Sequence, residues 1–150
     1  MDAERAREFL LTLPHTVETA QWGGLVFWTG DKAIGGKMFA LVNLEPGDHA
    51  VVMYAAGAER FHELVEIDGL MPAPYMARIF WVAANRWSAL RDSEWKDELR
   101  AAHAITLAKL PKGVHGVLAL PAKERNKVIA EKRKLLAAKD ALAKAKKAKK

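Results

Sequence analysis

Apolar residues near the start of the chain recur at the spacing of an α-helix. Residues 2–13 place one face at Ala3, Ala6, Leu10 and Leu13. Asp2 can cap the N-terminus of such a helix with its side-chain oxygen. Pro14 ends it, because the residue before a proline is pushed out of the α region. We therefore predict a helix over residues 2–13.

Two later stretches show the same spacing. In residues 58–68, one face carries Phe61, Leu64 and Val65, which should point into the core. Gly69 follows as a typical C-terminal helix stop. Residues 92–109 can be capped by Asp92 or Ser93, and one face carries Trp95, Leu99, Ala102 and Thr106. Both stretches are predicted to be helical.

The segments between these helices are dense in β-branched and aromatic residues. We predict strands over residues 25–29, 37–44, 49–55 and 79–87, separated by turns rich in glycine and proline. The strands alternate poorly between apolar and polar, so both faces of the sheet should be at least partly covered. Residues 79–87 are the most continuously apolar and suggest a central position. Residues 71–74 read as a rigid loop.

The order of these elements is helix, strands, helix, strands, helix. Helices gathered against a largely antiparallel sheet predict an α+β fold. We assign the compact domain to residues 1–112, a linker to residues 113–121, and a separate tail to residues 122–150.

The tail consists mostly of alanine, lysine, leucine, glutamate and arginine, which favour helix. Large apolar residues recur every seven positions at Val128, Leu135 and Leu142, with a second column at Ile129 and Leu136. This stripe could dock on the domain or pair with another chain. Residues 144–150 lack large apolar groups, so we expect the end of the tail to be disordered.

The net charge of +6 is unevenly divided along the chain. Residues 1–120 hold 12 Lys and Arg against 15 Asp and Glu, a balance of −3. Residues 121–150 hold 12 against 3, a balance of +9. Any attraction to polyanions therefore begins with the tail.

Other bulk features restrict the class of protein. The chain has no cysteine, which excludes disulfides, thiolate metal sites and cysteine nucleophiles. The charged N-terminus lacks the apolar core of a signal peptide, and no window approaches a membrane span. We expect a soluble cytoplasmic protein with no membrane contact.

Several fragments, in order, resemble the MmcQ/YjbR family of small bacterial proteins. They are Leu13-Pro14, Trp22-Gly23, Gly36-Lys37-Met38-Phe39-Ala40, Pro72-Ala73-Pro74-Tyr75, Trp81-Val82 and Ala108-Lys109-Leu110-Pro111. The resemblance covers roughly residues 3–112 and implies a frataxin-like fold, a curved antiparallel sheet packed by helices. It also implies two β-hairpin wings, the "double wing" for which DNA binding has been suggested.

No arrangement typical of an active site is found. The five histidines do not form a paired helical ligand motif, and neither serine lies in a nucleophile elbow. Glu4 and Glu8 share a helix face, but two carboxylates are too few for a persuasive hard-metal surface. We expect a protein that is not an enzyme and that needs no metal or cofactor.

Aromatic and basic residues near the strand ends are candidates for nucleic-acid contact. Partly exposed indoles could stack on bases at Trp22, Trp28 and Trp87, and nearby cations stand at Lys32, Lys37, Arg78 and Arg86. The same pattern is also typical of a well-packed small sheet. Core packing and stacking on bases are therefore both open for these tryptophans.

The tail supplies further candidate cations, at Lys132, Arg133, Lys139, Lys144, Lys146 and Lys147. Such contacts position a protein on DNA or RNA without reading its sequence. The first hypothesis is therefore a nucleic-acid-binding accessory protein, a monomer or weak dimer. The alternative is a protein-interaction or small-ligand module that uses the sheet face, with the tail as a docking or dimerising helix.

Overall fold

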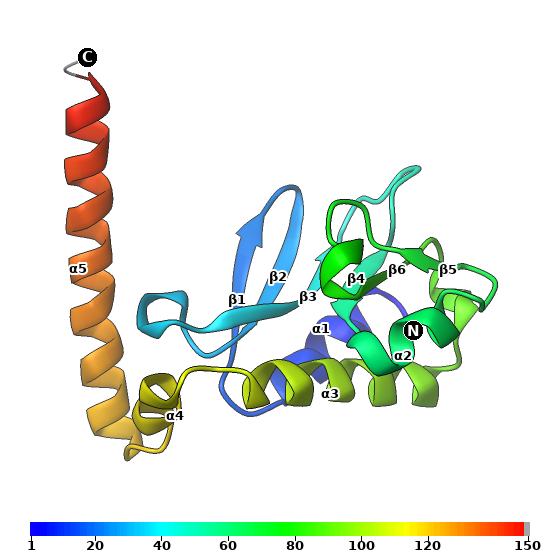
Figure 1. The fold of residues 1–150 in the computed structure, drawn as a ribbon, viewed down its shortest axis with the longest axis horizontal. Coiled ribbons are helices and arrows are strands. Elements are labelled where there is room, and N and C mark those ends of the chain that lie inside the picture. Colours follow the sequence, from blue (N-terminus) through cyan, green and yellow to red (C-terminus); the bar gives the residue numbers. More distant parts are fainter. Residues whose placement is uncertain (149–150) are drawn as a thin grey trace.

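A six-stranded antiparallel sheet forms the centre of the protein in a computed structural model that describes residues 1–148 (Figure 1). The strand order is β1-β2-β3-β4-β6-β5. The strands are β1 (Thr16–Gln21), β2 (Gly24–Thr29), β3 (Lys37–Asn43), β4 (Val52–Ala55), β5 (Leu70–Pro72) and β6 (Trp81–Ala84). The helices are α1 (Ala3–Leu11), α2 (Ala58–Leu64), α3 (Asp92–Ala108), α4 (Lys112–Leu118) and α5 (Ala122–Ala148). Three short 3-10 turns are η1 (Lys32–Ile34), η2 (Ala77–Ile79) and η3 (Trp87–Ala89). This is the expected α+β fold.

The first three predicted helices are confirmed as α1, α2 and α3. The side chain of Asp2 accepts a hydrogen bond from the Arg5 amide, as expected of an N-cap. The cap of α3 differs from the prediction, because Arg91 is the N-cap residue and Asp92 is already helical. Glu94 reaches back to accept from the Arg91 backbone N–H, which satisfies one of the free donors at the helix start.

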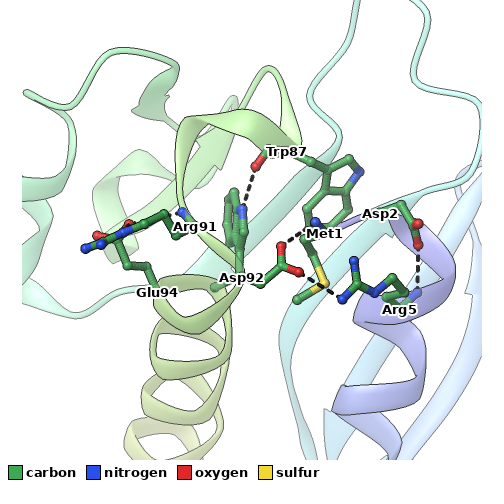
Figure 2. A network of polar contacts seen from close by, with 8 residues as sticks. Met1, Asp2, Arg5, Trp87, Arg91, Asp92 and Glu94 are labelled. Carbon is green, nitrogen blue, oxygen red and sulfur yellow. Dashed lines mark hydrogen bonds and ion pairs between the residues drawn. The ribbon is translucent and has the colours of Figure 1, made fainter.

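Asp92 has a different task, which is to join α3 to α1. Its carboxylate binds the amino group of Met1 and, at 2.9 Å, the guanidinium of Arg5 (Figure 2). These cations hold the pKa of Asp92 below its usual range, the Met1 hydrogen bond being the larger cause. Nearby, the Trp95 indole donates to the Trp87 carbonyl at 2.7 Å (Figure 2). The start of α3 is thus fixed to its neighbours by polar contacts.

Strand β1 was not predicted. It pairs with β2 through a two-residue turn at Trp22 and Gly23, both with positive φ (53° and 76°). Positive φ at both central positions is typical of a type I′ hairpin turn, where Asn-Gly is the usual signal. Tryptophan in the first of these positions hid the hairpin from sequence analysis.

The second half of the sheet also departs from the predictions. The loop expected at 71–74 is wrong in its first half, because Met71 and Pro72 belong to the short edge strand β5. The expected strand at 79–87 narrows to β6, because η2 and η3 take up its two ends. All four residues of β6 are buried, and the strand lies between β4 and β5. Its predicted interior position is confirmed.

The two faces of the sheet are covered differently. One face packs against α1, α2 and α3, and its core includes Phe39, Tyr54 and Trp95, all fully buried. The buried clusters on the opposite face contain residues of strands and loops only, among them Trp28, Leu41 and Trp81. We call this second surface the open face, because no helix packs on it within residues 1–148.

The β2–β3 connection brings two glycines into close contact. A Cβ on Gly36 would lie 2.0 Å from the Gly30 carbonyl oxygen and 2.7 Å from that of Thr29. Only a residue without a side chain fits between these backbone atoms. Further along, the register of β2 and β3 shifts opposite Phe27 and Trp28, which leaves Phe39 as a bulge. Bulges bend the strand that carries them.

The C-terminal third is more ordered than expected. Instead of the loop expected near residues 113–121, the chain forms α4, whose Val114 and Leu118 pack with Leu110. Helix α5 follows, confirming the basic helical tail, and Figure 1 shows it standing beside the sheet rather than across it. Disorder was expected from residue 144, but the helix continues through Ala148. Residues 149–150 of the tail lie outside the described residues.

The glycine contact yields a test of the β2–β3 connection. Gly36→Ala should lower the free energy of unfolding by about 3 kcal/mol, because the new Cβ meets backbone atoms that cannot move aside. Gly116→Ala is the matched control, since its Cβ would meet no atom within 4 Å inside α4. It should instead stabilise the protein by about 0.5–1 kcal/mol. Urea denaturation measures both, and equal effects would contradict the packing described.

Candidate phosphate-binding helix and open-face groove

Helix α5 is attached to the body through an ion pair. The guanidinium of Arg133 binds the Asp31 carboxylate, with Nε donating at 2.9 Å to Oδ2 and a terminal nitrogen also in contact. Asp31 is buried and also accepts from the Ala33 amide, so its position is fixed by η1. The hydrogen bond to Asp31 raises the pKa of Arg133. The pair therefore sets the point at which α5 leaves the body.

The seam around this pair is a shallow cavity of about 390 Å³ between α5 and the β1–β2 end of the sheet. His15, Leu118, Arg125 and Ile129 line it together with the ion pair. Burial lowers the pKa of His15, and the charge of Arg125 lowers it further. The first turns of α5 thus pack against the body and influence its electrostatics.

Beyond the seam, α5 projects into solvent. Every residue from 134 to 148 is exposed. Within the described part of the chain, Arg133 is the one α5 side chain that forms an ion pair. The other candidate cations of the tail, at Lys132, Lys139, Lys144, Lys146 and Lys147, are therefore not neutralised by the body's carboxylates. They stay available to an external anion.

The cations are spread around the helix. At 100° per residue, Lys132, Lys139 and Lys146 fall close together, whereas Lys134 and Lys144 lie on other sides. The lysines beyond the seam therefore do not gather on a single face of α5. A polyanion can therefore approach α5 from several directions.

The candidate cations of the body come from separate elements of the fold. Lys32 lies on η1 with its Nζ 6.0 Å from the Trp28 ring centroid, and Lys37 begins β3, where it lines a cleft of about 300 Å³ with Lys109. Arg78 is exposed on η2. Arg86 binds Asp68 at 2.9 Å and is thereby partly neutralised.

Of the three tryptophans expected near the surface, only Trp22 is substantially exposed, at 70%. Trp28 is buried and donates to Thr19 at 2.8 Å. Trp87 packs edge-to-face on Trp95, with centroids 5.3 Å apart, beside the main core. Trp28 and Trp87 therefore pack within the domain. Of the three, Trp22 remains as a stacking candidate.

Trp22 contributes to a groove that sequence analysis did not foresee. This open-face groove has a volume of about 590 Å³, and its apolar lining includes Trp22, Met38, Leu41, Met53, Tyr75 and Trp81. Tyr75, fully exposed in the β5–β6 connection, also has positive φ. Among the lining residues Glu45 is acidic and none is Lys or Arg. The groove is therefore apolar with a slightly acidic rim.

A sequence signal for the groove existed but was weak. Tyr75 follows Pro72-Ala73-Pro74, in a fragment that also carries the family resemblance. Met38 and Met53 come from strands that are neighbours in the sheet. Because residues two apart on a strand share a face, the alternation of β3 could have been followed, had the bulge at Phe39 not interrupted it.

Metal-binding clusters, membrane-spanning helices and buried histidines were further possible features of the described residues. Within residues 1–148, no three His, Asp or Glu side chains gather as a metal site. The same part of the chain contains no helix both long and apolar enough to cross a membrane. His103 is buried, with Nε2 2.7 Å from the Pro14 carbonyl oxygen, so it connects α3 to the segment between α1 and β1.

The sheet and its helices define a small α+β domain whose fold is also seen in a solved structure. Deinococcus radiodurans protein DR2400, whose crystal structure is described as a domain of the DUF419 family model, matches with a TM-score of 0.68. The match covers 80% of this chain and 89% of that chain at 21% sequence identity. At that identity the likeness shows the fold.

The family model called YjbR matches residues 11–105, and the chain belongs to this family, also known as MmcQ/YjbR. The resemblance stated from the sequence is confirmed. No curated protein matches the chain significantly. Helices α4 and α5 lie outside the matched residues.

The seam generates a pH prediction. The folded pKa of His15 lies below the unfolded value near 6.5, so the unfolded chain binds more protons as pH falls. Stability should therefore decrease as pH falls from about 6.5 through the folded pKa. His15→Asn should weaken this pH dependence, because asparagine does not titrate. Asparagine also tolerates the left-handed backbone at this position (φ 59°), so the variant should keep the fold. Chemical denaturation at several pH values measures it, with His115→Asn as the control for removing an exposed imidazole.

Proposed function

We propose that this protein binds nucleic acid without catalysis, through phosphate contacts made by α5. The observation that carries the proposal is the set of exposed α5 lysines that form no ion pair with the body. The unpaired lysines from Lys132 to Lys147 are spread over about 22 Å of helix, at about 1.5 Å per residue, a density of roughly one cation every 4 Å. That density suits a polyanion better than a single small anion.

Counterion release supplies the driving force. Each phosphate neutralised on duplex DNA releases condensed ions, so affinity falls steeply with salt, with a slope of about −0.9 per contact. The scatter of cations around α5 favours contacts that do not read base sequence. DNA and RNA are both suitable partners on this physical basis.

The body contributes less to this proposal. Its charge balance of −3 over residues 1–120 opposes a polyanion, and its candidate cations lie on separate elements. The open-face groove has no Lys or Arg in its lining, so a phosphate backbone would find no counter-charge there. The proposed interface is therefore the helix rather than the hairpin wings.

A pair of charge-matched variants tests the proposal. One carries Lys132→Gln, Lys139→Gln, Lys144→Gln and Lys147→Gln on α5. The other carries Lys32→Gln, Lys37→Gln, Arg78→Gln and Arg86→Gln on the body, with the same loss of four charges. Fluorescence anisotropy with duplex DNA, single-stranded DNA and RNA between roughly 50 and 200 mM salt measures affinity and slope.

The α5 variant should lose at least about tenfold in affinity, and its salt slope should fall by about one per lysine removed. The body variant should keep most of both. A larger loss in the body variant would assign binding to the wings instead. Absence of binding by the unaltered chain at low salt would contradict the proposal as a whole.

The groove favours a second candidate function, a protein-interaction or small-ligand-binding module that uses the open face. Exposed Trp22 and Tyr75 on opposite loops, with methionines between them, form the kind of adaptable apolar surface found at binding sites. This candidate does not exclude the first, because the groove and the projecting half of α5 are separate surfaces.

A further inference from the structure

Two apolar surfaces of this protein have no partner within the described residues. One is the open-face groove, with exposed Trp22 and Tyr75 at its edges. The other is a ridge on α5 formed by Leu135 and Leu142, which are 64% and 61% exposed. The two leucines are seven residues apart, so they lie on the same side of α5 at a spacing of about 10 Å.

We propose that the α5 ridge of one molecule docks in the open-face groove of a second copy. The chain carries both halves of this contact. Its own ridge cannot supply the partner in the conformation described, because α5 leaves the body at the Asp31–Arg133 pair beside η1. The groove lies instead over β3, β4 and β6 on the open face.

Charge complementarity identifies a basic helix as the occupant. The groove lining has no cation, and Glu45 stands at its rim with Asp48 in the same exposed turn. On α5, Lys139 lies four residues after Leu135 and three before Leu142, hence beside the ridge. A docked ridge would bury leucine against tryptophan and methionine and leave lysine facing the acidic turn.

The same charges argue against the other occupants. A nucleic acid would bring phosphate to a surface with a negative rim, where counterion release has no cation to drive it. A second copy brings both apolar area and positive charge. If each molecule inserts its helix into the other, the contact closes on itself as a two-fold dimer.

The test uses the full chain and two double variants chosen to preserve folding. Leu135→Glu with Leu142→Glu removes the ridge, and glutamate keeps the helical propensity of α5. Trp22→Asn with Tyr75→Asn removes the aromatic edges of the groove. Asparagine suits both positive-φ positions, and before Gly23 it creates a favoured hairpin turn. Leu11→Glu, which changes an exposed leucine on α1, is the matched control.

Sedimentation velocity in the absence of nucleic acid measures the mass as protein concentration is raised. The full chain and the Leu11 control should shift from monomer to dimer, whereas each double variant alone should stay monomeric. An equimolar mixture of the two double variants should recover association, because that pair retains one intact ridge and one intact groove.

Two results would overturn the inference. One is a full chain that remains monomeric at every concentration. The other is a groove variant that still dimerises, which would place α5 against another α5. Circular dichroism spectra and unfolding temperatures that match those of the unaltered chain show that a variant is folded. Loss of the dimer in that variant then reflects loss of docking. Nucleic-acid binding depends on the α5 lysines, and the groove variant changes neither these lysines nor the net charge, so DNA binding by the groove variant lets the two proposals fail separately.

Discussion

The asymmetric covering of the sheet determines most of this structure. Helices α1, α2 and α3 bury one face, and burial of residues such as Phe39 and Trp95 supplies the main core. The other face has to exclude water with strand and loop side chains alone, which accounts for its methionines and tryptophans. Long, adaptable side chains cover a surface that no helix reaches. The groove is the part of that surface where this covering is incomplete.

The tail responds to a different constraint, which is electrostatic. A body with excess carboxylates could have neutralised the lysines of α5 by wrapping the helix around itself. Instead one arginine is paired with one buried aspartate, and the rest of the helix is directed away. The buried position of Asp31 makes this pair more specific than a surface contact, because a carboxylate out of water requires its partners. Within residues 1–148, the lysines of the tail therefore keep charges that no carboxylate of the body neutralises.

Much of the fold could be predicted from the chain because local signals agreed with the tertiary structure. Asp2, Pro14 and the spacing of Ala6 and Leu10 define α1 without reference to any other element. Prediction failed where a residue takes its role from a distant partner. Trp22 occupies a turn position that usually signals itself through asparagine, and α4 depends on packing of Val114 and Leu118. The groove likewise depends on which strands become neighbours, which no local pattern records.

The exposure of α5 beyond Arg133 has a consequence for its own cohesion. Residues 134–148 are all exposed, so no packing against the body stabilises their helical conformation. Isolated helices of about this length are marginally stable in water. Alanine content favours the helix, while repulsion among closely spaced lysines opposes it. Its helix–coil balance is therefore decoupled from unfolding of the sheet. Screening or neutralising those lysines removes this repulsion and shifts the balance toward the helix.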